Sequence, residues 1–524
     1  MQSSMIGKVL AGLILVVLSF FVGAGGAENV KDSLGGISLI VGGFVLLCMG
    51  PRSWMLIFLI APFWPLLPNR ITEKIEGEYL IGAVILAYWL LMRIMGYVKF
   101  IWRSMPVLDF LMLLFLSLVI ATYIRRPVGI EFIGFETEYM GASPVIIAVA
   151  SCVFYFVISV IPFSYTQMQK VLRISMYFVI AVSVVLCAKL LIQGGGQWGA
   201  GQYDSLSHNL QEGRNVVFAD VSKNIMLFIY AGVPLLRILT SPILLGVMVC
   251  CLVGLCLSGL RSYLITTALP MLCMSFVKRE AVVVACLVVT AYIGVMSLSA
   301  TRVVEEFPFA IQRIMSMIPG VHVSASAARH AQGTIDWRKD LWSMALDSRS
   351  GYIKDYVWGD GYGNEKKAVR TYERSVMRGE TPYQSMDYFA SNGLWHLGYL
   401  HFLHRVGLVG LGLITILFLY LFVEFFRVGM LLRGSPFMFP YLFFVSEVVL
   451  YAPSLCFLSL SDLYFFRSFA SIAYMKLIYC MAKEHGYLAS HGRDRKYVPM
   501  MIKTHQAVLS SADMPASAQL RAHI

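Results

Sequence analysis

Long apolar stretches recur along nearly the whole chain of 524 residues, and they constrain its fold more than any other feature. A helix needs roughly 20 apolar residues to cross a bilayer core of about 30 Å. The candidate spans are residues 6–24, 35–50, 53–68, 79–97, 106–124, 144–163, 172–192, 223–240, 242–260, 262–277, 281–299, 403–426, 436–456 and 462–481. The sequence therefore predicts an all-α polytopic membrane protein with about 12–14 transmembrane helices.

The composition agrees with a bilayer environment. Hydrophobic residues make up 58% of the chain and charged residues 14%, whereas a soluble domain is typically about 45–50% apolar and 25% charged. All ten cysteines lie in apolar runs, so no disulfide framework or cysteine-based metal site is indicated. The net charge of +12 resides mostly in short links between spans. That is the positive-inside pattern, so the charge indicates topology and contact with anionic membrane lipids, not with nucleic acid.

The basic links also predict which segments lie outside the cell membrane. If the N-terminus is cytoplasmic, the basic links fall on the cytoplasmic side. The polar segments 69–78, 125–143, 193–222 and 300–395 then lie on the outer side of the membrane, which is the periplasmic side if the cell is Gram-negative. The first apolar run ends in small residues at 23–27, which would also suit a cleaved signal peptide. Cleavage would leave the remaining topology unchanged.

These assignments divide the chain into four parts. Residues 1–299 and 396–481 are predicted transmembrane helices, and residues 482–524 a cytoplasmic tail. The part between, Ala300–Trp395, is called the 300–395 segment below. It is rich in tryptophan and tyrosine, so it can bury a core of its own. We expect it to be a mainly helical extracytoplasmic loop that covers a membrane-embedded cavity as a lid.

Two local patterns stand out within the 300–395 segment. Asp336–Leu346 has the apolar spacing of an amphipathic helix. Trp358–Gly363 contains three glycines, which permit positive φ, and this predicts a tight turn. The glycine pattern lacks the strand, helix and spacing of a dinucleotide-binding loop.

Arg214 and Arg261 lie beside predicted spans on the outer side. A guanidinium at a membrane boundary needs an anionic partner or must reach to the interface. Both arginines are therefore either interfacial anchors or parts of a bidentate clamp for a phosphate or pyrophosphate. Whether Arg125, Arg126 or Arg338 also belongs to such a clamp stays open.

His396 directly follows the 300–395 segment, where the chain re-enters the membrane. A neutral imidazole there is either a general base or a hydrogen-bonded interfacial histidine. His401 and His404 are additional candidates, and three histidines also suggest a metal. On a helix, however, His401 would point about 140° away from His396 at 100° per residue, and no acidic ligand has a supporting spacing. We therefore expect no metal and no cofactor.

Three acidic residues within or near predicted spans support a different class of function. Glu424, Glu447 and Asp462 would suit a proton relay, which is a feature of transporters. A flippase or other transporter of a lipid-linked oligosaccharide is thus the alternative. Paired inverted repeats, which are typical of transporters, are not evident in the sequence.

Several short motifs resemble those of a known superfamily, and they occur in its order. They are the Ser258–Arg261 turn, the pair Trp342–Leu346 and Trp358–Gly363, and the pair His396–Leu400 and Gly407–Gly410. With these motifs and its architecture, the chain resembles the O-antigen ligase and O-antigen polymerase superfamily over nearly its whole length. These are polytopic glycosyltransferases that use polyprenyl-pyrophosphate-linked glycans at the outer leaflet.

The resemblance implies an activity and a set of site residues. His396 would be the base and Arg214 and Arg261 would hold the pyrophosphate, in a metal-independent, inverting transfer to an acceptor hydroxyl. The product would be a surface polysaccharide such as O-antigen or exopolysaccharide. The chain departs from the superfamily pattern at Leu397, where Asn or Ser is usual, and at Leu260, where Ser is usual. A flippase and a chain-length regulator would be partners, and both polymerase and ligase remain open.

Overall fold

The computed structural model describes residues 87–127 apart from 89 and 98, 139–140, 143–161, 164–165, 167–168, 172, 216–258, 261–365 apart from 348, 386–391, 393, 395–456 and 464–488. The predicted spans 6–24, 35–50 and 53–68, the first part of 79–97 (residues 79–86), most of 172–192, the small-residue run 23–27, Asp462 and residues 489–524 lie outside these ranges. The chain divides into two compact units, Met1–Met481 and Ala482–Ile524.

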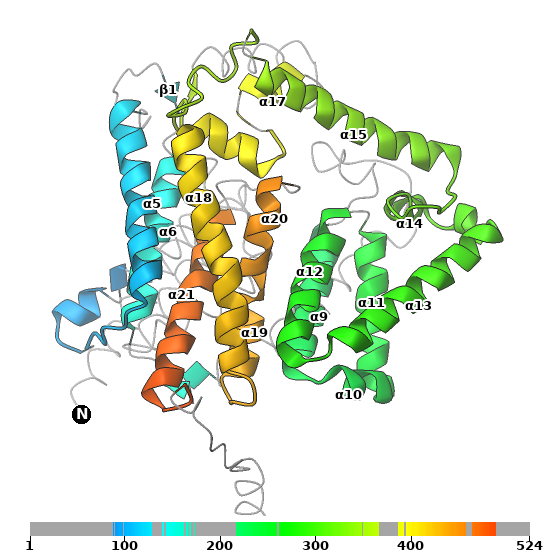
Figure 1. Cartoon of the computed structure of the whole chain (residues 1–524), viewed down its shortest axis with the longest axis horizontal. Helices are drawn as coiled ribbons and strands as arrows, with labels where there is room; N and C mark the ends of the chain where they lie inside the picture. Colours follow the sequence, from blue (N-terminus) through cyan, green and yellow to red (C-terminus); the bar gives the residue numbers. More distant parts are fainter. Residues whose placement is uncertain are drawn as a thin grey trace, which may run out of the picture. The chain divides into compact units, whose positions relative to one another are not determined.

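Helices dominate the described residues (Figure 1). They are α5 (Pro106–Arg125), α6 (Ser143–Val160), α9 (Val216–Gly232), α10 (Leu235–Thr240), α11 (Pro242–Leu257), α12 (Arg261–Lys278), α13 (Ala281–Ala300), α14 (Phe309–Met315), α15 (Ala325–Leu346), α17 (Met386–Ser391), α18 (Gly398–Leu431), α19 (Met438–Val445), α20 (Tyr451–Cys456) and α21 (Tyr464–Glu484). Two short 3-10 helices are η4 (Val303–Glu306) and η6 (Ser446–Leu450). The strands β1 (Tyr139–Met140) and β2 (Asn364–Glu365) form one antiparallel pair.

Four of the described helical stretches are long and apolar enough to cross a membrane. They are Pro106–Arg125, Ala281–Ala300, Gly398–Leu431 and Met438–Cys456. The shorter apolar helices Val145–Val160 and Pro242–Leu257 accompany them. The prediction of a helical membrane protein is therefore confirmed in its main point.

Three of the predicted spans are interrupted, and one of them, 403–426, is broken at Gly407. The single span predicted for 223–240 is wrong, because α9 ends at Gly232 and α10 begins after Pro234. Proline has no N–H to continue the helical hydrogen bonds and restricts the residue before it, so the helix ends there. The stretch 436–456 is divided into α19, η6 and α20. Glu447 lies in the 3-10 part, η6.

The helices of the larger unit pack in two neighbouring sets. Helix α5 packs against α6 and α18, while α9 packs against α11, α12 and α19. A buried polar cluster joins the first set to α21, because Lys476 Nζ lies 2.6 Å from Asp109 Oδ1 of α5. The hydroxyl of Tyr155 in α6 donates to the same oxygen at 2.6 Å. Lys476 is only 3% exposed, so its pairing with Asp109 offsets the cost of burying its charge.

The 300–395 segment folds around an amphipathic helix, as the spacing predicts. Helix α15 includes Asp336–Leu346 and begins earlier, at a Ser324 cap whose hydroxyl accepts from the N–H of Ala327. Its buried face joins a core that also includes the start of α18. The buried members of this core are Leu341, Ala345, Ile353, Ala390, Trp395, Leu397, Leu400 and Leu403. The segment therefore packs directly onto α18.

Candidate functional site

Helix α18 is broken at Gly407, whose φ of 66° and ψ of −170° are far from helical values. A first arm, Gly398–Val406, meets a longer second arm at this residue, and Figure 1 shows the sharp bend between them. In a continuous helix, the N–H of Leu408 would donate to the carbonyl of His404, and the N–H of Val409 to that of Arg405. The break leaves all four of these groups in need of other partners.

A turn of the 300–395 segment supplies these partners. The N–H groups of Leu408 and Val409 donate to the carbonyl oxygens of Tyr356 and Val357, at 2.8 and 3.2 Å. In return, the carbonyl oxygens of His404 and Arg405 accept from the N–H groups of Asp360 and Gly361, at 2.6 and 3.0 Å. We call residues 355–361 the inserted turn. It takes the place of the helical partners within α18, so each of the four groups keeps a hydrogen-bond partner.

Glycines permit this close approach of two backbones. Gly359 and Gly361 have φ of 79° and 89°, as the predicted tight turn requires. A Cβ on Gly359 would lie 2.5 Å from the backbone of Arg405 and Gly407. A Cβ on Gly407 would collide with the carbonyl of Val357. No side chain fits at either position, so the contact depends on glycine.

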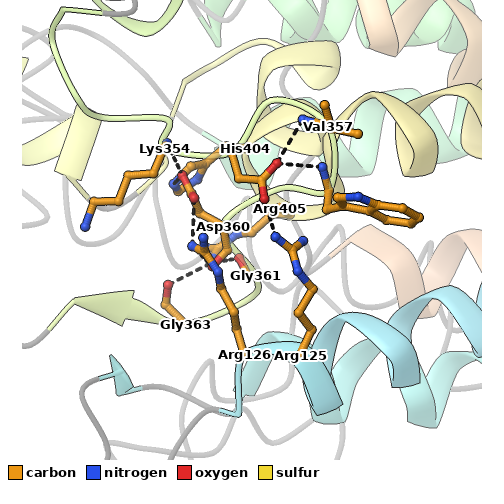
Figure 2. Close-up of polar contacts among 11 residues, drawn as sticks. Arg125, Arg126, Lys354, Val357, Asp360, Gly361, Gly363, His404 and Arg405 are labelled. Atoms are coloured by element: carbon orange, nitrogen blue, oxygen red, sulfur yellow. Dashed lines mark hydrogen bonds and ion pairs between the residues drawn. The ribbon is translucent and has the colours of Figure 1, made fainter.

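Asp360 is the centre of the charged groups around the inserted turn (Figure 2). Its Oδ1 accepts from Arg126 Nη1, which reaches from the end of α5, at 2.7 Å. Its Oδ2 accepts from the N–H of Lys354 at 2.7 Å and lies 3.8 Å from Nε2 of His404. Asp360 is 7% exposed and His404 also 7%. One buried carboxylate thus joins α5, the inserted turn and α18.

Asp355 makes a second link between the inserted turn and α5. Its carboxylate forms an ion pair with Arg125 and accepts hydrogen bonds from the N–H groups of Val357 and Trp358. The bond from Trp358 and the pairing with Arg125 favour the charged carboxylate, so the pKa of Asp355 is lowered. Arg125 and Arg126 also suit the last turn of α5, because a helix C-terminus attracts positive charge.

Arg405 faces the other side of the inserted turn from within α18. Its Nη1 donates to the carbonyl oxygens of Gly361 and Gly363, each at 3.4 Å. The residue is 4% exposed. Arg126, Arg405 and His404 therefore surround the inserted turn, and Figure 2 shows all three directed toward Asp360 and Gly361. The two arginines of this group carry positive charge, and guanidinium groups suit an anionic headgroup as well as the carbonyl and carboxylate oxygens of the turn.

His396 lies immediately before α18 in a left-handed conformation, with φ of 51°. Its imidazole is flanked by two aromatic rings, those of Trp337 and Phe389, with centroids 5.7 and 5.3 Å away. The preceding residue, Trp395, is fully buried, and its carbonyl accepts from Trp342 Nε1 at 2.9 Å. A left-handed backbone is uncommon outside glycine and marks a position that the surrounding structure enforces.

The other two histidines lie on the first arm of α18 and contact the same glycine. Nδ1 of His401 lies 3.3 Å from the carbonyl oxygen of Gly393. A Cβ on Gly393 would lie 2.5 Å from Nδ1 of His404, whose ring also meets that of Trp395 edge-on at 5.9 Å. Among the residues that the structure describes, no three His, Cys, Asp or Glu side chains gather as metal ligands.

The three arginines predicted as site residues are Arg214, Arg261 and Arg338, whereas His404 lies beside Asp360 and Trp395. Arg214 lies outside the described residues. Arg261 is the first residue of α12, which packs against α9 and η6. Arg338 is exposed on α15. The arginines at the inserted turn are instead Arg126, which pairs with Asp360, and Arg405, which donates to Gly361 and Gly363.

The sequence marks Arg126, Arg405 and Asp360 as unusual positions, although it does not indicate that they lie close together. Arg126 and Arg405 are charged residues at the boundaries of apolar runs, where a charge needs a partner. Asp360 lies within the glycine-rich turn that stands out in the sequence. Neither known family models nor curated protein sequences match this chain. The case for its function therefore depends on its own residues.

Proposed function

We propose that the protein is an integral membrane glycosyltransferase of surface polysaccharide assembly. It transfers a glycan from polyprenyl pyrophosphate to an acceptor hydroxyl, as an O-antigen or exopolysaccharide polymerase or as an O-antigen ligase. In this proposal the chain has about 12–14 spans in a bacterial inner membrane, and the 300–395 segment and the active site lie on the outer face.

The observation that supports the proposal most is the folded 300–395 segment inserted into the broken α18. Broken helices and ionisable residues at membrane depth are found where a membrane protein binds a polar substrate. Here Arg126, His404 and Arg405 lie around the inserted turn, and His396 is two residues before the first arm. A cationic, histidine-containing site beneath a folded lid fits a glycan joined to a lipid pyrophosphate.

The chemistry requires little beyond positioning and charge. An acceptor hydroxyl forms a bond to the anomeric carbon as the bond to the pyrophosphate oxygen breaks, and this inverts the anomeric centre. The leaving pyrophosphate needs stabilisation of its charge, which Arg214 and Arg261 supply in this proposal. His396 removes the proton of the hydroxyl, a contribution of about 10²–10⁴ in rate. Arg338, His401 and His404 are additional candidates for substrate contacts.

A strain lacking the chain tests the proposal and separates its two versions. If the protein is a polymerase, single lipid-linked repeat units are expected to accumulate and surface chains to disappear. If it is a ligase, long lipid-linked chains are expected instead. Normal surface glycan in this strain would contradict both versions. Glycan size is measured by gel electrophoresis of cell extracts, with the strain complemented by the wild-type chain as the control.

The second candidate is a transporter of a lipid-linked oligosaccharide, and one ion pair favours it. Lys223 of α9 lies 2.6 Å from Glu447, which is inside the candidate span Met438–Cys456. Ionisable residues inside a span often serve transport. In the deletion strain, a transporter would leave lipid-linked repeats on the cytoplasmic leaflet, whereas a transferase would leave them on the outer leaflet. Accessibility of the repeats to an added lectin in spheroplasts distinguishes the two.

A further inference from the structure

Asp360 uses both its backbone and its carboxylate in polar contacts around the inserted turn. Its carboxylate binds Arg126 of α5 and the N–H of Lys354, and its own N–H donates to the carbonyl of His404. The carbonyl of Asp360 also accepts from Arg126 Nη1 at 3.2 Å. A single residue thus connects three separate parts of the chain.

A chain of contacts leads from Asp360 to His396. The imidazole of His404 lies between the Asp360 carboxylate, at 3.8 Å, and the ring of Trp395, at 5.9 Å between centroids. Trp395 is fully buried and directly precedes His396. Packed side chains in such a core move little on their own, so a shift at Asp360 reaches His396 through His404 and Trp395.

We propose that Asp360 is a positioning residue: it keeps the inserted turn in the break of α18 and thereby fixes His404, Trp395 and His396 in place. The inference rests on the proposed function, because it concerns the position of the proposed base. It also makes a claim about structure alone, namely that the first arm of α18 depends on the Asp360 carboxylate.

The variant Asp360→Asn removes the negative charge and nearly preserves the size of the side chain. It loses the charge-assisted bond to Arg126 and one of the two oxygen acceptors, and the partly exposed Arg126 is left without its carboxylate. Asp360→Glu restores a carboxylate. The matched control is Asp340→Asn, which makes the same chemical change on the exposed face of α15.

Hydrogen–deuterium exchange of the full-length protein in lipid nanodiscs tests the structural claim. We expect Asp360→Asn to raise exchange about tenfold in peptides covering 395–409, because loss of a charged hydrogen bond is worth about a factor of ten or more. We expect Asp340→Asn to leave these peptides unchanged and Asp360→Glu to restore most of the protection. Wild-type protection in Asp360→Asn would overturn the proposal.

Glycan synthesis in cells, normalised to folded protein in the membrane, tests the link to His396. We expect about a tenfold loss for Asp360→Asn and recovery in Asp360→Glu, because one charged bond fixes the geometry. Raised exchange with full synthesis would also overturn the proposal. If deletion of the whole chain leaves the glycan normal, the proposed function fails. In that case exchange in peptides covering 395–409 still decides whether Asp360 positions this region.

Discussion

The backbone N–H of Leu408 in α18 donates to the carbonyl oxygen of Tyr356 in the inserted turn at 2.8 Å. In a continuous helix it would donate to the carbonyl oxygen of His404. A residue of α18 thus takes its hydrogen bond from a segment about 50 positions earlier in the chain. The N–H groups of Leu408 and Val409 and the carbonyl groups of His404 and Arg405 all have replacement partners, so the break leaves none of these four groups unsatisfied. The bend in α18 is therefore a stable feature that depends on residues 355–361.

Gly407→Ala is expected to destabilise the protein by about 1–3 kcal/mol or more. The backbone angles at this position are nearly exclusive to glycine, which accounts for about that cost. The added Cβ would also collide with the Val357 carbonyl. Thermal unfolding of the purified protein measures the effect, and hydrogen exchange at Leu408 and Val409 shows whether the inserted turn has left.

Gly412→Ala is the matched control for this prediction. Gly412 lies in the second arm of the same helix, and a Cβ there meets nothing within 4 Å. Alanine in a regular helix is more favourable than glycine by about 0.5–1 kcal/mol, so this variant should be as stable as the wild type or more stable. Equal losses in both variants would contradict the assignment of Gly407 as the break.

The helical membrane architecture, the amphipathic α15 and the glycine turn could be predicted because each depends on local pattern. Apolar length predicts a span, the spacing of Trp337, Leu341 and Ala345 predicts one buried helix face, and glycine predicts positive φ. The break at Gly407 could not be predicted, because the apolar run 403–426 passes through it without interruption. What bends α18 is a turn from elsewhere in the chain.

The grouping of Arg126, Asp360 and His404 could not be predicted for a related reason. Arg126 and Asp360 are 234 positions apart, and no sequence spacing relates residues that meet only through tertiary packing. The position of His396 after the 300–395 segment is visible in the sequence, but its left-handed backbone is not. A strained backbone is a property of the packed structure, since it requires Trp337 and Phe389 on either side.

The conformation of His396 permits a sharper test of the proposed base. Asparagine tolerates the left-handed region better than other residues with a side chain, so His396→Asn should keep the fold and lose the imidazole. We expect glycan synthesis to fall by about 10²–10⁴ while the thermal unfolding temperature changes little. His396→Val, with a branched side chain, should lower that temperature as well.

A histidine within the 300–395 segment is the control for the His396 variants. His322 is exposed, and only its backbone N–H is engaged, by the hydroxyl of Ser299. His322→Asn should therefore leave both stability and synthesis unchanged. Full glycan synthesis by His396→Asn at wild-type protein levels would exclude His396 as the base.

Acid should weaken the link between the inserted turn and α5. The pKa of Asp355 is lowered below its ordinary value of 3.8 in the folded protein. Its charged form therefore stabilises the fold above pH 3.8, and this contribution disappears as the pH falls through the lower, folded-state pKa. Asp355→Asn should be less stable than the wild type at neutral pH, and the difference should vanish in strong acid. A difference that persists unchanged at the lowest pH would contradict this.

Substitution of Lys223 and Glu447 distinguishes a structural ion pair from one that carries protons in transport. Removing one partner of a buried pair leaves the other charge uncompensated, at a cost of about 3–5 kcal/mol, while an apolar replacement of both is often neutral. Glu447 keeps 31% of its side chain exposed, so we expect the lower end of that range for Lys223→Met.

The double variant Lys223→Met/Glu447→Leu should then recover most of the lost stability, as measured by thermal unfolding in nanodiscs. If the pair is structural, the double variant should also restore glycan synthesis, since a transferase needs no proton pathway through α9 and η6. If the pair carries protons in transport, stability returns and synthesis does not. A double variant that recovers thermal stability but not glycan synthesis would therefore favour the transporter over the glycosyltransferase.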